Sequence, residues 1–356
     1  GTYPIVNEKI SLTIFQRQIP KIVDYETNEF TKYFEELTNI DFKFETAPTD
    51  SITEKINLMM TSGDLPDMFM YDTPDPSRFG VSEGMLIDLS TLVEEVMPNY
   101  KKAMEEYPEI KGATTSTDGK IYALAGINDC FHCQYSQKLW VNTMWLEKMD
   151  VEMPKTTEDF YDVCKKYKEI NPAGIPIIGS IDSWNTDPSC FLTNAFILDP
   201  GKVTAAMPVK VIEVDGTLDT IVNKDEYKEA LKYLNKLYAD DLIYEGTFTQ
   251  KNEQLRQIAL DEEMPILFFA GGANVNVLDA SLAPEIYKNY VAVPPLEGPE
   301  GVKQSTFFKY FPIQIQRFAI TKDCKYPEAA ARVGDYFFTT EGQLRSYYGV
   351  KGTGWD

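Results

Sequence analysis

Strand-type and helix-type patterns alternate at the start of the chain. Residues 9–16 are rich in strand formers, and the stretch from Thr27 places apolar side chains at helical spacing. A second strand pattern at residues 42–44, a helix pattern over 52–62 and a third strand over 66–71 follow. This β-α-β-α-β order predicts a parallel sheet with helices packed on its faces.

Local signals predict where several of these elements begin and end. Ser51 and Glu54 have the spacing of a capping box, which predicts the start of the second helix, and Gly63 predicts its end. Asp118-Gly119 predicts a turn before a strand over residues 120–125.

The same alternation restarts in the second half of the chain. We expect a short strand over residues 139–142, a helix capped by Thr156, a hairpin turning at Asp215-Gly216 and a buried strand over 266–270. A chain of 356 residues exceeds the ~250–300 residues that one core usually serves, so two α/β lobes are expected. No flexible tether separates them, which predicts several crossings and a hinge.

Charge and hydropathy exclude several classes of partner. The net charge of −21 would repel a nucleic-acid backbone or an anionic membrane surface. The longest apolar stretch, around residues 264–273, is roughly half of what a bilayer-spanning helix needs. We therefore expect no nucleic-acid partner and no membrane-spanning segment.

The cysteines do not form the framework of a disulfide-rich protein, because there are only 5 of them and they are scattered. The segment Cys130-Phe131-His132-Cys133 is a local cluster of metal-ligand types, but a closed zinc site needs four ligands. A buried or bridged cysteine pair is the favoured interpretation. Asp182, Asn185 and Asp187 lack the spacing of a calcium loop, so no metal site is predicted.

Catalytic motifs are scarce. The sequence contains 1 histidine, His132, which leaves little room for a Ser-His-Asp triad or a histidine general base. It has no nucleophile elbow, phosphate-binding loop or dinucleotide fingerprint, and we predict no cofactor. Carboxylate pairs are too numerous in so acidic a chain to nominate a glycosidase dyad.

Aromatic residues make up 13% of the chain, which favours recognition of a carbohydrate. A neutral sugar has apolar C–H faces and a rim of hydroxyl groups, so its site needs flat rings and hydrogen-bonding side chains. Most aromatic residues on helical stripes belong to the core, and Trp145 is assigned there. Three other tryptophans are Trp140, Trp184 and Trp355.

One segment, Ser62-Gly63-Asp64-Leu65-Pro66-Asp67, resembles the Ser-Gly-Asp-x-Pro-Asp signature of the family 1 extracellular solute-binding proteins. These are the ligand receptors of bacterial carbohydrate ABC importers. Further landmarks are similar to that family in the same order, and the closing segment resembles its LplA-like lipoprotein subgroup. They are residues 77–89, 118–124, 139–142 with 154–156, 325–330 and 349–355.

The resemblance implies a two-lobed periplasmic-binding-protein-like fold of type II. Each lobe would contain a mainly parallel sheet flanked by helices, with the ligand clamped between the lobes. The implied division gives residues 1–126 and 275–317 to lobe 1, residues 127–274 and 318–356 to lobe 2, and crossovers near 126–138, 270–276 and 312–320.

Ligand-binding candidates follow from the resemblance and from the rule that open α/β sheets bind ligands beyond the carboxyl ends of their strands. In the first lobe they are Gln16, Arg17, Asp64, Tyr71 and Asp72. Beyond the first crossover they are Asp129, Phe131, Trp184, Gly271 and Gly272, with Trp355 near the end of the chain. The two glycines would let a ligand approach the backbone closely.

The implied function is capture of an oligosaccharide outside the cell and its delivery to ABC permease subunits, without catalysis. We expect a monomer on the outer face of the bacterial cell membrane, with its lipid anchor removed from this chain and its C-terminus truncated. Two alternatives stay open: a glycoside-active enzyme that uses a carboxylate pair in the cleft, and a receptor for a non-sugar solute such as a peptide.

Overall fold

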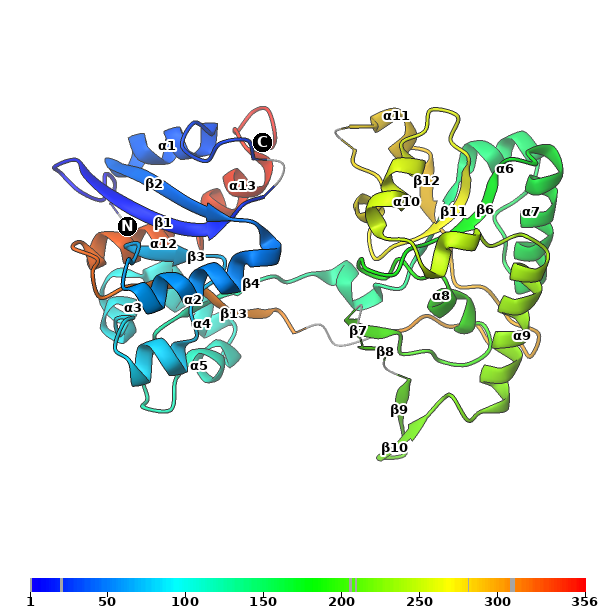
Figure 1. Ribbon diagram of the computed structural model, residues 1–356, viewed down its shortest axis with the longest axis horizontal. Helices are drawn as coiled ribbons and strands as arrows, with labels where there is room; N and C mark the ends of the chain where they lie inside the picture. The colour runs from blue at the N-terminus through cyan, green and yellow to red at the C-terminus, as the bar shows by residue number, and fades with distance from the viewer. Residues whose placement is uncertain (1, 20–21, 205–206, 209, 281, 308–310) are drawn as a thin grey trace. The chain divides into compact units, whose positions relative to one another are not determined.

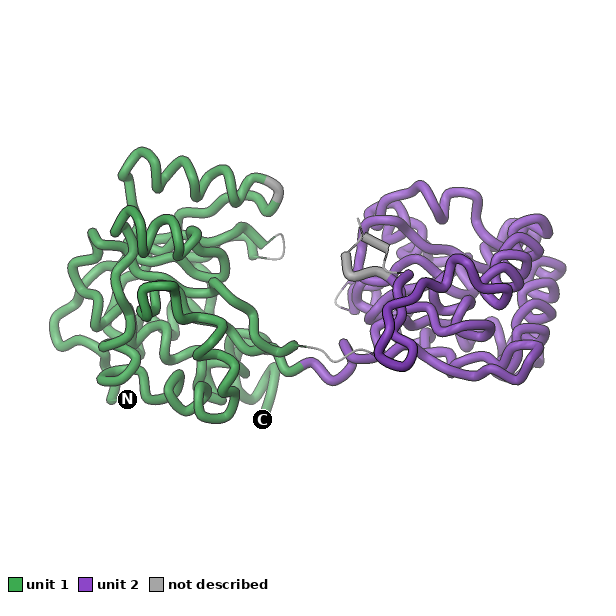
Figure 2. Tube along the Cα trace, turned by 90° about the horizontal axis from the view of Figure 1, so that it is seen from below, with its two compact units in different colours: residues 1–129, 311–356 green, residues 130–310 purple. Residues whose placement is uncertain are grey.

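The computed structural model describes residues 2–19, 22–204, 207–208, 210–280, 282–307 and 311–356. The chain divides into two compact units, with residues 1–129 and 311–356 in unit 1 and residues 130–310 in unit 2 (Figure 2). This division corrects the predicted lobes, because residues 275–310 belong to unit 2 and residues 318–356 to unit 1. The predicted crossover near 270–276 is wrong, since the strands on either side of it share one sheet.

A five-stranded sheet forms the centre of unit 1, in the order β2-β1-β3-β13-β4. β1 runs parallel to β2 and β3, whereas β13 runs antiparallel to both of its neighbours, β3 and β4. The sheet is therefore mixed rather than mainly parallel. Its strands are β1 (Ile10–Arg17), β2 (Ile40–Ala47), β3 (Met68–Met70), β4 (Leu124–Ile127) and β13 (Ile313–Ile320).

Helices cover both faces of this sheet, because its inner strands bury side chains on either side. On one face, Leu12, Phe42 and Ile320 share a core with the helices α1, α3, α4 and α12. On the other face, Phe15 and Phe69 pack with α2. The helices of unit 1 are α1 (Glu29–Thr38), α2 (Ile52–Ser62), α3 (Ser90–Val96), α4 (Pro98–Glu106), α5 (Glu109–Thr114), α12 (Pro327–Tyr336) and α13 (Thr340–Tyr348) (Figure 1).

Unit 2 has a four-stranded mixed sheet in the order β12-β5-β11-β6. β5 runs antiparallel to β12 and β11, and β11 runs parallel to β6. The predicted strand at 266–270 is confirmed as β11, and all of its residues are buried. The strands of the unit are β5 (Leu139–Asn142), β6 (Ile175–Ile178), β7 (Lys202–Thr204), β8 (Met207–Pro208), β9 (Val211–Val214), β10 (Thr217–Thr220), β11 (Ile266–Ala270) and β12 (Tyr290–Ala292).

The helices of unit 2 pack on both faces of its sheet as well. Phe268 shares one core with Phe160 and Trp145, so the assignment of Trp145 to the core is confirmed, and Phe269 shares the other core with Leu255. The helices are α6 (Thr143–Met149), α7 (Thr157–Ile170), α8 (Ser189–Thr193), α9 (Asp225–Ala239), α10 (Asn252–Ala259) and α11 (Pro284–Tyr287).

Local signals predicted some element ends and missed others. Thr156 caps α7 in a capping box with Asp159, and Gly63 ends α2 at a φ of 77°, both as expected. The capping box at Ser51 is wrong, because a 3-10 turn precedes α2 and the Ser51 hydroxyl donates to the carbonyl of Pro48 instead. The strand predicted over 120–125 lies later, as β4.

Candidate ligand-binding site

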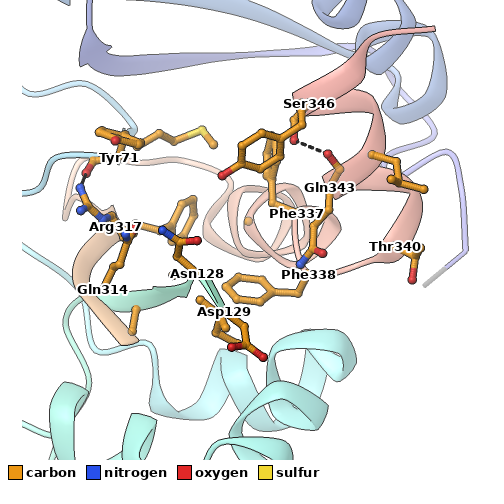
Figure 3. Close-up of a pocket in the computed structure, with 18 of the residues that line it drawn as sticks. Tyr71, Asn128, Asp129, Gln314, Arg317, Phe337, Phe338, Thr340, Gln343 and Ser346 are labelled. Atoms are coloured by element: carbon orange, nitrogen blue, oxygen red, sulfur yellow. Dashed lines mark hydrogen bonds between the residues drawn. The ribbon is translucent and has the colours of Figure 1, made fainter. Parts of the chain in front are cut away.

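A cavity of about 570 Å³ lies in unit 1 at one edge of its sheet (Figure 3). β1, β3 and β4 all end at this edge, and the antiparallel β13 begins there. The carboxyl ends of neighbouring strands thus converge where open α/β sheets bind ligands. The charged residues of the lining are Asp129 and Arg317. Its aromatic, amide and hydroxyl side chains are Tyr71, Phe318, Phe337, Phe338, Tyr347, Tyr348, Gln16, Asn128, Gln314, Gln343, Thr340 and Ser346.

Tyr71, the first residue after β3, lies between two guanidinium groups. The Cζ atoms of Arg17 and Arg317 lie 4.6 and 4.5 Å from the centroid of its ring. Its φ of 68° is unusual for a non-glycine residue. Its amide nitrogen donates to the carbonyl of Arg317 at 2.7 Å, and Nη1 of Arg317 donates to the carbonyl of Tyr71 at 2.6 Å. These contacts hold the ring at the rim of the cavity, beside Arg317 in Figure 3.

Arg17 and Asp72 form a bidentate ion pair. Nε and Nη2 of Arg17 donate to the two carboxylate oxygens of Asp72 at 2.6 and 2.5 Å. The hydrogen bond to Asp72 raises the pKa of Arg17, against a smaller opposing effect of burial. The carboxylate of Asp72 is therefore already paired with a side chain of the same unit, and its role is to hold Arg17 against Tyr71.

The C-terminal helices close another side of the cavity. Phe337 and Phe338 follow the end of α12, and Gln343 and Ser346 lie on α13 (Figure 3). The hydroxyl of Ser346 donates to the carbonyl of Gln343 at 2.9 Å. Asp129 lies beside Phe338 in Figure 3, and its carboxylate accepts a hydrogen bond from the Tyr107 hydroxyl at 3.3 Å. Aromatic rings and polar side chains thus line the same cavity.

A second cavity of about 420 Å³ adjoins the first. It shares Gln16, Tyr71 and Phe337 with the larger cavity and adds Arg17 and Tyr25. The predicted residues Gln16, Arg17 and Tyr71 are thus brought together in one region of unit 1.

In unit 2, Trp184 packs against Gly272. A Cβ atom at position 272 would lie 2.5 Å from carbon atoms of the indole, so only glycine allows this contact. The amide nitrogen of Gly272 donates to the carbonyl of Trp184 at 2.9 Å, and Nζ of Lys138 donates to the carbonyl of Gly272 at 2.7 Å. Nε1 of Trp140 donates to the carbonyl of Gly271 at 2.8 Å. The structure therefore joins Trp184 to the predicted glycine pair.

Exposed aromatic rings also gather near the start of unit 2. The Phe131 side chain is 73% exposed, and its ring centroid lies 5.9 Å from that of Tyr135. Tyr135 in turn lies 5.4 Å from Phe307. Phe131 was predicted from the sequence, whereas its two aromatic neighbours were missed.

Two predicted residues, Asp64 and Trp355, line neither of the two cavities. Asp64 is exposed after the end of α2 and does not line a described cavity. Trp355 lies near Arg345 and Lys351, and its Nε1 donates to the carbonyl of Gly349 at 3.0 Å. Neither side chain is among the described residues that line the two cavities, although Gly349, the hydrogen-bond partner of Trp355, lines the second one.

The structure shows the bonding of both groups that the sequence offers as possible cation ligands. Cys130 and Cys133 form a disulfide, which confirms the bridged pair. The carboxylate of Asp182 accepts a hydrogen bond from the backbone nitrogen of Asn252, and that of Asp187 accepts one from the backbone nitrogen of Ser189, so each caps a neighbouring backbone segment.

None of the helices in the described ranges has the length and apolar character needed to cross a bilayer.

Comparison with known proteins identifies the family. A model described as "Bacterial extracellular solute-binding protein" matches residues 17–344. The chain belongs to this family. The resemblance to the extracellular solute-binding proteins that the sequence segments indicated is therefore confirmed.

The relatives of this solute-binding protein include two curated sequences. The fructooligosaccharide ABC transporter substrate-binding protein FusA of Streptococcus pneumoniae is 28% identical over 312 residues, which cover 84% of this chain and 55% of FusA. Lipoprotein LipO of Bacillus subtilis is 24% identical over 331 residues, which cover 91% of this chain and 63% of LipO. The chain thus spans little more than half the length of these relatives.

Solved structures of related proteins confirm the fold. FusA of S. pneumoniae in complex with kestose superimposes with a TM-score of 0.77 at 25% identity, covering 96% of this chain and 70% of that structure. A maltose-bound MalE3 of T. maritima gives a TM-score of 0.55 at 16% identity, covering 97% of this chain and 80% of that structure. The solute-binding protein has the α/β fold of the type II periplasmic binding proteins, as predicted.

Proposed function

We propose that this chain is an extracellular substrate-binding protein that captures an oligosaccharide and delivers it to the permease of an ABC transporter. The observation that carries the proposal is the composition of the unit 1 cavity, which combines aromatic rings with amide and hydroxyl groups. Two relatives, the fructooligosaccharide-binding protein FusA and the lipoprotein LipO, support the class of ligand and an anchor to the cell surface. We further propose that the protein acts as a monomer.

The cavity offers a sugar both kinds of contact that it needs. Rings such as Tyr71 and Tyr347 provide flat surfaces for the C–H faces of a pyranose or furanose. Amides such as Gln16, Asn128 and Gln343 each carry donors and an acceptor, so one side chain can serve two hydroxyl groups. We propose that these residues, with Arg17 held by Asp72, form the unit 1 contribution to ligand binding.

Binding without catalysis is the function that the lining favours. A glycosidase needs two carboxyl groups on either side of the scissile bond. Asp129 is the single carboxylate among the described residues that line the larger cavity. A peptide receptor would need charged groups for the termini of its ligand, whereas the lining is dominated by neutral groups.

A thermal-shift panel of oligosaccharides tests the proposal. A ligand at 100 times its Kd should stabilise the protein by about 2.7 kcal/mol, which is seen as a rise in Tm. Fructo-oligosaccharides, galacturonides and malto-oligosaccharides form the panel. We expect one class to raise the Tm, and Tyr347→Ala, at an 80% exposed lining residue, to reduce that rise.

Tyr326→Ala is the matched control, because Tyr326 is an exposed tyrosine of unit 1 outside the larger cavity. It should leave the ligand-induced shift unchanged. A flat response to the whole panel, or release of reducing sugar from any member, would count against the proposed function.

The Trp184–Gly272 contact gives a second prediction about binding. Gly272→Ala should displace the indole, because the new methyl group would overlap its ring carbons. If Trp184 stacks on the ligand, the variant should weaken binding about tenfold or more, as should Trp184→Ala. Isothermal titration with the ligand found in the panel measures both.

Gly112→Ala is the control for this experiment, since no atom lies within 4 Å of the added methyl group there. Equal affinity of Gly272→Ala and the unaltered protein would exclude the indole from the binding surface.

A further inference from the structure

Cys130, His132 and Cys133 form the one group of three metal-ligand side chains within the described residues that could hold an ion. Their two sulfur atoms and an imidazole nitrogen all lie within 4.8 Å of one another. The proposed sugar-binding function does not use them. In the oxidised protein, both sulfur atoms belong to the disulfide and cannot bind a metal ion as thiolates. Reduction of the disulfide would free both of them.

The spacing of sulfur and nitrogen fits a tetrahedral zinc site. A Zn–S bond of about 2.3 Å and a Zn–N bond of about 2.05 Å at the tetrahedral angle separate sulfur and nitrogen by about 3.5 Å. The Sγ atom of Cys130 lies 3.4 Å from Nδ1 of His132. After reduction, rotation of the two thiol side chains must separate their sulfurs to about 3.8 Å, the spacing of two thiolates on one zinc ion.

The surrounding chain holds this turn in place by contacts that do not depend on the disulfide. Residues Phe131–Tyr135 form a 3-10 helix, and the amide nitrogen of Cys133 donates to the carbonyl of Cys130 at 3.2 Å. Nζ of Lys138 donates to the carbonyl of His132 at 3.0 Å. The indole of Trp184 contacts the imidazole edge-on, with ring centroids 5.7 Å apart. Together these contacts fix the backbone of the turn and pack one side of the imidazole.

We propose that Cys130, His132 and Cys133 form a redox-gated site for a thiophilic divalent cation of the zinc class. An external dithiol supplies two electrons: its thiolate attacks the disulfide, both cysteines become thiols, and the dithiol leaves as a cyclic disulfide. The cation then replaces the two thiol protons, which pass to solvent. His132 supplies the third ligand, and water takes the fourth position because His132 is exposed to solvent.

Metal titration of the full chain in two redox states tests the proposal. The protein is reduced with a phosphine, freed of reductant without oxygen, and titrated with Zn²⁺ alone. Co²⁺ serves as a spectroscopic probe, since thiolate ligation in a tetrahedral field gives visible and charge-transfer absorption. We expect one equivalent of metal on the reduced protein, and the oxidised protein should bind at least about a hundredfold more weakly.

Substitution of the proposed ligands distinguishes metal binding at this site from metal binding elsewhere in the protein. Cys130→Ser with Cys133→Ser leaves the three buried thiols, Cys164, Cys190 and Cys324, and should abolish the Co²⁺ thiolate bands. His132→Ala should weaken Zn²⁺ binding of the reduced protein about tenfold or more. Unchanged circular dichroism of these variants shows that they are folded.

Two results would overturn the proposal. One is reduced protein that binds no more Zn²⁺ than the oxidised protein. The other is His132→Ala with the affinity and Co²⁺ spectrum of the unaltered protein, because the two thiolates would then bind without the imidazole. Neither result bears on sugar binding by unit 1, so this proposal and the proposed function fail independently.

Discussion

Phe34→Ala should lower the free energy of unfolding of unit 1 by about 3–5 kcal/mol, the usual cost of truncating a buried phenylalanine. Phe34 is 3% exposed and lies on α1. Its ring stacks nearly parallel to that of Phe42 with centroids 5.4 Å apart, and its centroid lies 4.6 Å from that of Tyr336 and 5.7 Å from that of Phe337. One side chain therefore joins α1, β2 and the end of α12, and its loss leaves a cavity that three elements border.

Urea unfolding followed by far-UV circular dichroism measures this effect. Phe311→Ala is the control, because Phe311 belongs to unit 1 and is 56% exposed. It should change the free energy of unfolding by no more than about 0.5 kcal/mol. If the two variants were equally stable, Phe34 would not be a structural centre of the unit. Because Phe337 lines the larger cavity, Phe34→Ala should also weaken the sugar binding that we propose for it.

Asp335→Ala should cost about 2–3 kcal/mol, because a buried carboxylate would be removed from two donors. Asp335 is 5% exposed and lies on α12. It accepts hydrogen bonds from the amide nitrogen of Tyr100 at 2.8 Å and from Nδ2 of Asn99 at 2.7 Å. Both donors lie in the first turn of α4, which has no side-chain cap of its own. Asp335 thus caps that helix from a distant part of the sequence.

Asp335→Asn tests how much each of the two hydrogen bonds contributes to the free energy of unfolding. Its amide keeps one acceptor for the Tyr100 nitrogen but turns a donor toward Asn99, so we expect roughly half of the loss seen with alanine. Asp323→Ala, at an exposed aspartate, is the control and should be nearly neutral. The same urea titration measures all three variants. Equal stability of Asp335→Ala and Asp323→Ala would contradict the capping role.

Sequence patterns predicted the elements of the fold well where the signal is local. The alternation at the start of the chain, the Thr156 cap and the apolar run that forms β11 all depend on neighbouring residues. Pairings between distant strands were not predictable in this way. β13 pairs with β3 across roughly 250 residues, and nothing in its own sequence states that it runs antiparallel or that it belongs to unit 1.

The same distinction applies to the candidate site. Gln16, Tyr71 and Asp129 were predictable because each lies at or just beyond the end of a strand, and these ends converge at one edge of the sheet. Arg317 was missed because it lies within a strand whose neighbours are fixed by distant pairing. Phe337 was missed as well, because it lies just beyond the end of α12 and the cavity beside it depends on where that helix packs.

The position of β13 has a consequence for the order in which the protein folds during synthesis. Residues 130–310 form unit 2 by themselves and are complete before the ribosome reaches residue 313. In the sheet, β13 lies between β3 and β4. Until β13 has been made, β3 and β4 therefore each lack the strand that pairs with them on that side. A chain that emerges N-terminus first can therefore complete its second unit while β3 still has an open edge, and binding of a chaperone in that interval would prevent aggregation.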